Sequence, residues 1–183
     1  SDYRGGVVPP LPVGLISNTR MNEQSGIVVD FADHLTGNVS FNLKSRDVTP
    51  GAPVRLKFTF AEIPSSLGIG FDNYPGGLGR AWLQDETVSV MTIGEPITIL
   101  RRLSFRYVKI EVLGIPHYNF AFTDLECRAV TSAIAEPEPL PETTDPLTRE
   151  IDRVGLATLR VGMQTVYEDG PQRDQRLWIG DLY

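Results

Sequence analysis

The last fifteen residues hold the densest group of side chains suited to chemistry. Residues 169–183 read Asp-Gly-Pro-Gln-Arg-Asp-Gln-Arg-Leu-Trp-Ile-Gly-Asp-Leu-Tyr. Within them lie three carboxylates, two arginines and a tryptophan, namely Asp169, Arg173, Asp174, Arg176, Trp178 and Asp181. Carboxylates accept hydrogen bonds from sugar hydroxyls, and an indole face packs on the apolar side of a sugar ring. These residue types favour sugar binding and glycosidic cleavage, and they leave open a solvated charged loop with local ion pairs.

The run 169–181 resembles a motif of the family 78 α-L-rhamnosidases. That motif reads Asp-Cys/Gly-Pro-Gln/Lys-Arg-Glu/Asp, then a few residues, then Trp-Thr/Ile-Gly-Asp. The match covers thirteen contiguous positions, with the acidic, arginine, tryptophan and Gly-Asp elements in register. Residues 156–160 and 167–169 resemble the first helix of that family's (α/α)6 barrel. The strand-rich part, with Arg106-Tyr107-Val108, is similar to the β-sandwich that precedes the barrel.

The resemblance implies hydrolysis of terminal α-linked L-rhamnose with inversion of configuration. In such enzymes one carboxylic acid protonates the leaving oxygen, while a carboxylate on the opposite face activates water. Position by position, Asp174 matches the general acid. The residues that match the sugar subsite are Asp169, Arg173 and Asp181, which would hold rhamnose hydroxyls, and Trp178, which would shape the subsite. One departure is that the family's acid is commonly Glu, and Asp174 is one methylene shorter.

The second carboxylate comes from a later part of the barrel in that family. We therefore expect the general base beyond residue 183, and we expect this chain to be the front portion of a larger glycosidase. Acid–base catalysis by a pair cannot be run by one member, so the chain alone is expected to be inactive. Its expected partners are a rhamnose-containing carbohydrate and either the remaining barrel segment or a second copy of the chain.

Composition excludes several other classes of function. The formal net charge of −6 argues against nucleic acid or an anionic membrane as the main partner, since both require a basic face. One cysteine, Cys127, allows no intramolecular disulfide and no site built from several thiolates. His34 and His117 lie far apart with no ligand spacing around them, so we expect no zinc site and no cofactor.

The compartment is indicated only weakly. No run of eighteen apolar residues is present, and Ser1 does not begin a signal-peptide pattern. Either a signal has been removed or the chain begins within a longer protein. Asn38-Val39-Ser40 forms a glycosylation triplet, which is weak evidence for secretion. A secreted or periplasmic protein is favoured, and a cytoplasmic one stays open.

The first 131 residues read as strands that would support this segment. Short runs rich in Val, Ile, Phe and Thr alternate with clusters of Gly, Pro, Asn and Asp, without a long helical pattern. The expected strands are residues 26–31, 37–43, 54–60, 88–93, 96–100, 106–112 and 119–130. This spacing predicts a mainly β fold, an antiparallel β-sandwich, followed by a linker and the first helix of a truncated (α/α)6 barrel.

The prolines of 135–142 mark a boundary, because alternating prolines fix φ and prevent a helix. We expect an extended segment at 1–20, the sandwich at 21–131, the linker at 132–144, and a helix with the acid-bearing loop at 145–183. Thr144 or Asp145 caps the helix, with Pro146 in its first turn, and Gly170-Pro171 is expected to end it. Its apolar stripe requires a partner surface.

A Gly-rich loop at 64–80 supports an alternative function. Its aromatic residues Phe71 and Tyr74, with Trp82 nearby, could stack on a sugar ring, although the composition favours a mobile surface excursion. The alternative to a catalytic chain is therefore a non-catalytic β-sandwich that stabilises a barrel or binds carbohydrate.

Overall fold

The computed structural model describes residues 6–8, 20–21, 26–46, 48–68, 76–77, 79, 82–114, 118–135 and 137–182. Its strands are β1 (Val7–Val8), β2 (Arg20–Met21), β3 (Gly26–Ser45), β4 (Val54–Ala61), β5 (Asp85–Val90), β6 (Ile93–Thr98), β7 (Leu103–Gly114) and β8 (Phe120–Ala129). The helical elements are the short 3-10 turns η1 (Pro64–Gly68) and η4 (Ile179–Leu182) and the α-helix α2 (Pro146–Gly162).

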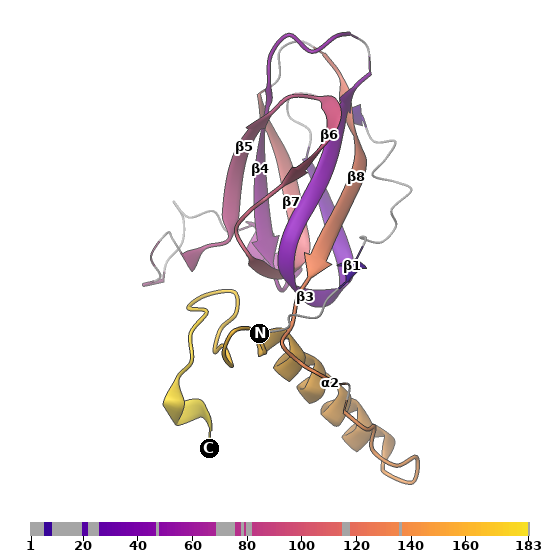
Figure 1. The fold of residues 1–183 in the computed structure, drawn as a ribbon, viewed down its shortest axis with the longest axis vertical. Coiled ribbons are helices and arrows are strands. Elements are labelled where there is room, and N and C mark those ends of the chain that lie inside the picture. Colours follow the sequence, from indigo (N-terminus) through magenta and orange to yellow (C-terminus); the bar gives the residue numbers. More distant parts are fainter. Residues whose placement is uncertain are drawn as a thin grey trace.

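The strands form one antiparallel sheet in the order β1-β8-β3-β7-β4-β5, with β6 also paired to β3 and β2 to β8 (Figure 1). The sheet curls so that its two halves face each other. Phe41 of β3 and Phe58 of β4 pack with ring centroids 5.0 Å apart, although β7 lies between their strands in the sheet. The predicted mainly antiparallel β structure is confirmed. It differs from a sandwich of two separate sheets, because β3 belongs to both halves.

Strand β3 contains two segments that the sequence predicts as separate strands, residues 26–31 and 37–43. Its first half pairs with β7, and its second half pairs with β8 on one side and β6 on the other. The expected break at 32–36 is a bulge within the strand, where the pairing with β7 shifts between Asp30 and Leu35. Ala32 has φ of 66°, and its N–H donates to Oδ1 of Asp30 at 2.7 Å. This local bond satisfies the N–H that the bulge removes from the ladder.

The core lies between the two curled halves and follows the predicted alternation. Val39, Phe41 and Leu43 are fully buried, and so are Leu56, Phe58 and Phe60 on β4. Further rings and aliphatic side chains from β7 and β8 complete it, namely Leu103, Phe105, Val108, Ile110, Phe120, Phe122 and Leu125. Cys127 is buried among them, as expected for a small hydrophobic residue.

Two strands are shifted from their expected positions by three residues. The turn lies at Met91-Thr92, so β5 ends at Val90 and β6 begins at Ile93. Thr92 is buried, and its hydroxyl hydrogen bonds the phenol oxygen of Tyr118 at 3.1 Å. A polar residue inside an apolar run therefore marks the turn, because its hydroxyl has a specific partner there.

Helix α2 begins as predicted, with Asp145 as its N-cap accepting from the N–H of Thr148 at 2.9 Å and with Pro146 in the first turn. The predicted end at Gly170-Pro171 is wrong, because α2 ends at Gly162. Eight residues that could have extended it form a loop instead.

The exit of β8 explains where α2 ends. The hydroxyl of Thr131 donates to the carbonyl oxygens of Arg160 and Met163, at 2.8 and 3.2 Å. The N–H of Ser132 donates to the same carbonyl of Met163 at 2.7 Å. These donors satisfy carbonyls that the last turn leaves open, so the chain can leave the helix here without loss of hydrogen bonds.

Most of α2 points away from the sheet (Figure 1). Five of its large apolar residues or those just after it are exposed, namely Leu147, Ile151, Val154, Leu159 and Val166. One helix does not form a barrel, so the barrel remains a prediction. No helix in the described part of the chain is long and apolar enough to cross a membrane.

Candidate active site

Residues 163–178, the post-helix loop, return from α2 to the lower end of the sheet (Figure 1). The N–H of Asp169 donates to the carbonyl of Arg176 at 3.0 Å, so the loop closes on itself like a small hairpin. The turn between them uses positive φ at Gly170 and at Gln175, 56° and 53°. Inside it the N–H of Arg173 donates to the carbonyl of Gly170 at 2.7 Å. This closed turn places residues 173 and 174 at its tip.

Arg173 joins the two carboxylates of the turn. Its Nη2 lies 3.3 Å from Oδ2 of Asp169, and its Nε donates to Oδ1 of Asp174. The Arg173 and Asp169 side chains are nearly half exposed, whereas that of Asp174 is only 10% exposed. Asp174 is thus the least accessible carboxylate of the turn, and it lies beside a fixed cation.

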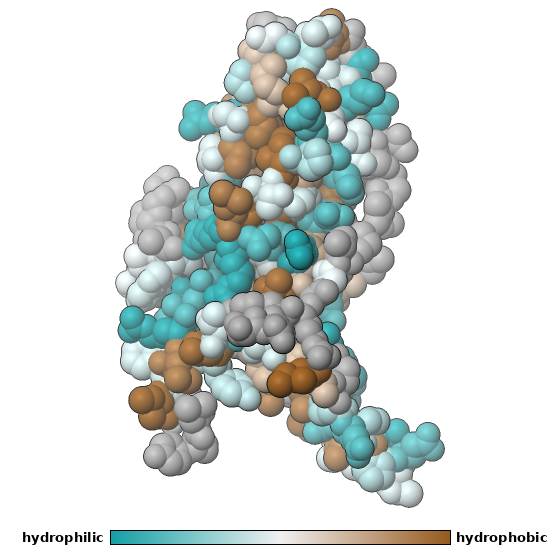
Figure 2. Space-filling view, viewed as in Figure 1, coloured by the Kyte–Doolittle hydropathy of each residue, from teal (hydrophilic) through white to brown (hydrophobic). Residues whose placement is uncertain are grey.

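Trp178 completes the cluster. Its indole Nε1 lies 3.3 Å from Oδ2 of Asp174, and the guanidinium carbon of Arg176 lies 5.4 Å from its ring centroid. Trp178 is 44% exposed, so part of the ring remains open to solvent. Hydrophobic residues also reach the surface around the nearby C-terminal turn (Figure 2), where Ile179 is exposed. The cluster offers paired acceptors, cationic donors and an apolar face, the groups that bind a sugar.

Four of the predicted site residues, Asp169, Arg173, Asp174 and Trp178, therefore come together. The side chain of the fifth, Asp181 in η4, lies outside the described residues. A groove of about 1510 Å³ opens elsewhere, between α2, the proline-rich segment and the end of the sheet, and no residue of the cluster lines it.

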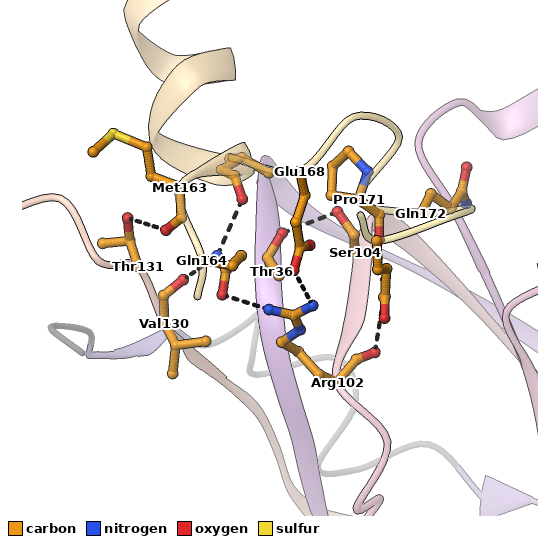
Figure 3. A network of polar contacts seen from close by, with 12 residues as sticks. Thr36, Arg102, Ser104, Val130, Thr131, Met163, Gln164, Glu168, Pro171 and Gln172 are labelled. Carbon is orange, nitrogen blue, oxygen red and sulfur yellow. Dashed lines mark hydrogen bonds and ion pairs between the residues drawn. The ribbon is translucent and has the colours of Figure 1, made fainter. Parts of the chain in front are cut away.

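Sequence reasoning missed the residues that hold the loop to the sheet. Arg102, just before β7, donates through Nη2 to Oε1 of Glu168 at 2.5 Å and through Nη1 to Oε1 of Gln164 at 3.0 Å (Figure 3). The Glu168 side chain is 1% exposed. Arg102 and Glu168 lie 66 residues apart, so no local pattern signals the pair.

Three glutamines add to this attachment. The side chain of Gln84 donates to the carbonyl of Gln172 at 2.9 Å and accepts from the N–H of Ser104 at 2.8 Å. Gln172 in turn donates to the carbonyl of Phe60 at 3.3 Å. Gln175 donates to the carbonyl of Pro171 at 2.9 Å, within the loop, and to the carbonyl of Arg102, just before β7, at 3.5 Å. Glutamine reads as a surface residue in sequence, so nothing there signals these roles.

Other residues singled out from the sequence lie apart from the cluster. His34 Nε2 lies 3.0 Å from the Ser104 hydroxyl and 3.4 Å from Glu62. Both contacts use one ring nitrogen, whereas a nucleophilic triad needs the acid on Nδ1 and the serine on Nε2, so this is not such a triad. Burial lowers the pKa of His34, against the opposite effect of Glu62 and Asp33.

The Asn38 amide of the glycosylation triplet donates to the carbonyls of Ile99 and Leu100, at 3.3 and 3.0 Å, so it is engaged in the folded chain. Trp82 is 45% exposed, while Phe71, Tyr74 and His117 lie outside the described residues. In the described part of the chain, no three His, Cys, Asp or Glu side chains gather so as to hold a metal ion.

Comparison with known proteins identifies relatives of the chain. The family model described as the glycosyl hydrolase family 78 alpha-rhamnosidase N-terminal domain matches residues 12–129. A rhamnosidase from Klebsiella oxytoca with rhamnose bound is 32% identical over 99% of this chain, with a TM-score of 0.93. The chain spans 39% of the length of that enzyme. No relative was found among the curated proteins.

Two further structures share the fold. The family 78 rhamnosidase of Bacillus sp. GL1 is 19% identical, with a TM-score of 0.68, over 97% of this chain and 16% of its own. An α-L-rhamnosidase from Dictyoglomus thermophilum is 20% identical, with a TM-score of 0.60, over 96% of this chain and 18% of its own. At these identities the likeness concerns the fold alone.

Proposed function

The chain belongs to the glycosyl hydrolase family 78 α-rhamnosidase N-terminal domain family, and on that premise we propose that it is part of an inverting glycosidase that removes terminal α-L-rhamnose from glycans or glycosides. One observation carries the proposal. The Klebsiella rhamnosidase, which has rhamnose bound, matches 99% of the present chain, including the post-helix loop, at a TM-score of 0.93.

Each residue of the cluster has a proposed role. Asp174, as the general acid, transfers its proton to the leaving glycosidic oxygen while the bond from that oxygen to the anomeric carbon breaks. A water molecule attacks the anomeric carbon from the opposite face and gives its proton to a carboxylate base. Asp169, Arg173 and Asp181 hold rhamnose hydroxyls, and Trp178 packs against the ring.

The hydrogen bonds of Asp174 are compatible with this role. Both of its oxygens face donors, Nε of Arg173 and Nε1 of Trp178. Such donors match an ionised carboxylate, which is the form that a general acid reaches once it has given up its proton. The arrangement therefore supports the state in which Asp174 has given its proton to the leaving oxygen.

The base is proposed to lie outside these residues, in the part of the relative that this chain does not span. The exposed apolar face of α2 supports this, because a helix with such a stripe packs against others in a helical domain. We place the sheet domain at 21–131 after an extended segment at 1–20, the linker at 132–144, and the first barrel helix with the acid-bearing loop at 145–183.

The test is an assay of the full-length protein with p-nitrophenyl α-L-rhamnoside, with the 183-residue chain measured in parallel. We expect turnover by the full-length protein and none by the 183-residue chain. Proton NMR of the first product should show β-L-rhamnose, the inverted anomer. Turnover of other glycosides alone would refute the substrate, and initial release of α-L-rhamnose would refute inversion.

A second function is favoured by the attachment of the post-helix loop to the sheet. The contacts of Arg102, Gln84 and Gln172 support a sheet domain that stabilises the helical part rather than acting on sugar. Titration of the 183-residue chain with rhamnose and short rhamnosides, followed by NMR, separates this from carbohydrate binding. Shifts confined to the sheet would favour a binding module.

A further inference from the structure

The end of the sheet and the post-helix loop share one buried polar network (Figure 3). We propose that Arg102 and Gln84 of the sheet domain are positioning residues for Asp174, and that they hold the loop which carries it. This inference rests on the proposed function, since it concerns the same acid. The hydrogen-bond network can also be tested without an activity assay, by hydrogen exchange of the loop amides.

Arg102 holds the loop on the side that precedes Asp169. Its guanidinium binds Glu168 at 2.5 Å and Gln164 at 3.0 Å. A carboxylate with 1% of its side chain exposed has lost nearly all its water, so it needs a charged partner with fixed geometry. The fork of a guanidinium supplies that partner and contacts a second residue at once. Glu168 is the residue directly before Asp169, so this pair sets where the turn begins.

Gln164 extends the same attachment into the sheet. It is 1% exposed, and its amide nitrogen donates to the carbonyls of Val130 at 2.8 Å and Val161 at 3.1 Å. Its oxygen accepts from Arg102, so this one side chain links the exit of β8, the end of α2 and the entry to β7.

Gln84 holds the loop immediately before Arg173. Its side chain, 4% exposed overall, accepts from the N–H of Ser104 in β7 and donates to the carbonyl of Gln172. Its own carbonyl accepts from the N–H of Phe60 in β4, at 2.9 Å. Since β4 and β7 are neighbours in the sheet, two strands hold Gln84 in place. Its hydrogen bond to Gln172 then holds the backbone close to the acid.

These attachments place Asp174 relative to the sheet. The turn is closed by the bond from Asp169 to Arg176, so its tip moves with its base. Arg102 and Gln84 hold this turn at two points, on residue 168 just before it and on residue 172 within it. An acid works only within hydrogen-bond reach of the leaving oxygen, and a shift of about 1 Å can cost on the order of 100-fold in rate. The sheet thus acts on the reaction without touching the sugar.

Substrates with different leaving groups distinguish a role in positioning the acid from a role in stability alone. p-Nitrophenolate leaves without help from an acid, whereas an alkoxide leaves only when protonated. A displaced acid therefore slows the hydrolysis of alkyl rhamnosides much more than that of the p-nitrophenyl rhamnoside. A loss of folded protein lowers both rates by the same factor.

The experiment uses the full-length protein with Arg102→Lys and Gln84→Glu. Gln84→Glu keeps the acceptor for Ser104 and replaces the donor to Gln172 with an oxygen. The control is Arg106→Lys, which alters the ion pair between Arg106 of β7 and Asp30 of β3, away from the loop. We expect kcat for methyl α-L-rhamnoside to fall about 10- to 100-fold, and kcat for the p-nitrophenyl substrate to fall less than about threefold, with KM little changed. Equal losses on both substrates would overturn the positioning role.

Hydrogen exchange of the 183-residue chain gives the independent readout. In both variants the amides of Asp169 and Arg173 should exchange faster, while those of the central strands stay protected, and the control should match the unaltered chain. Unchanged exchange at these amides would overturn the inference. If the full-length protein hydrolyses no rhamnoside, the proposed function fails, while exchange still decides whether the sheet holds the loop.

Discussion

The indole Nε1 of Trp178 lies 3.3 Å from Oδ2 of Asp174, four residues before it in the chain. Arg173 donates to the other oxygen of the same carboxylate. The turn closed by Asp169 and Arg176 is what brings a cation and an indole to one carboxylate from neighbouring positions. The chemistry of the cluster thus depends on a local backbone shape that the sheet supports from outside.

Asp174→Asn removes the proton that the acid must give while keeping the size of the side chain. In the full-length protein we expect kcat on an unactivated α-L-rhamnoside to fall by about 100-fold or more. The protein should stay folded, because asparagine keeps the volume of the side chain and an oxygen that can accept from Arg173. Glu150→Gln on α2, where the carboxylate pairs with exposed Arg153, is the matched control. Wild-type kcat in Asp174→Asn would contradict the assignment of the acid.

Phe58→Ala should strongly destabilise the curled sheet. Phe58 is fully buried, and its ring lies 5.0 Å from that of Phe41 and 6.3 Å from that of Phe60. Truncation of such a ring costs about 3–5 kcal/mol, since a cavity remains. Urea unfolding of the 183-residue chain measures this. Leu113→Ala at a 49% exposed site serves as the control, with an expected cost under about 1 kcal/mol. Similar midpoints for the two variants would place the core elsewhere.

His34 should make the chain less stable in mild acid. Burial lowers the pKa of His34 below 6.5 in the folded chain, with Glu62 and Asp33 acting in the opposite direction. Below pH 6.5 the unfolded chain therefore binds more protons, so the free energy of unfolding falls as pH falls through the folded pKa. Urea unfolding between pH 7.5 and about 5 should show this fall, and His34→Gln should flatten it.

The control for this pH effect is Asp30→Asn. The hydrogen bond from Arg106 lowers the pKa of Asp30 below 3.8, so stability from this pair is present above pH 3.8 and lost only as pH falls further. Asp30→Asn should leave the slope between pH 7.5 and about 5 unchanged. An identical slope in the unaltered chain and in His34→Gln would refute the role of His34.

Cys127 should resist thiol reagents in the folded chain. Burial raises the pKa of its thiol to about 12, so almost no thiolate exists at neutral pH, and the side chain is fully buried. Iodoacetamide labelling, followed by mass spectrometry, should be at least about 100-fold slower in buffer than in urea. As the only cysteine, it reports on global opening without interference. Complete labelling within minutes in buffer would contradict its burial.

The exposed face of α2 should make the 183-residue chain associate with itself. Leu147 and Ile151 are 67% and 64% exposed on neighbouring turns of the helix. Apolar stripes of this kind are normally covered in a monomeric protein. Sedimentation velocity over a concentration series should show dimers or larger species, and these should decrease in Leu147→Lys with Ile151→Lys. Arg153→Gln, on an exposed ion pair, is the control. A monomer at all concentrations would refute this.

The strands could be predicted from sequence because their signals are local. Alternation at 39, 41 and 43 predicts which side chains enter the core, and all three are buried. The end of α2 could not be predicted, because the groups that donate hydrogen bonds to the carbonyls at this end, on Thr131 and Ser132, follow a distant strand. The sequence predicts a gap between strands at Ala32, where the structure has a bulge, because a pattern of hydrophobic residues does not show the hydrogen bond from Ala32 to Asp30.

The site was predicted through its motif and not through its supports. Asp169, Arg173, Asp174 and Trp178 stand close in the chain, so a short run of letters displays them together. Arg102 and Gln84 stand 66 and 88 residues from their partners, and no periodicity joins residues so distant. Their roles follow only from the burial of Glu168 and the bonds of the Gln84 amide.

Strand β3 also has a consequence in time. Its partners β6, β7 and β8 all come later in the chain, and β6, the first of them, begins at Ile93, whereas β3 ends at Ser45. Strand β3 therefore waits without these partners while a ribosome makes about the next fifty residues, and β8 is complete only at Ala129. Non-local pairing of this kind is slow, and it keeps an apolar strand exposed to neighbouring chains. Once β8 has been made, the residues that emerge next are the linker, α2 and the post-helix loop. The surface that receives the loop can therefore be assembled before the loop itself leaves the ribosome.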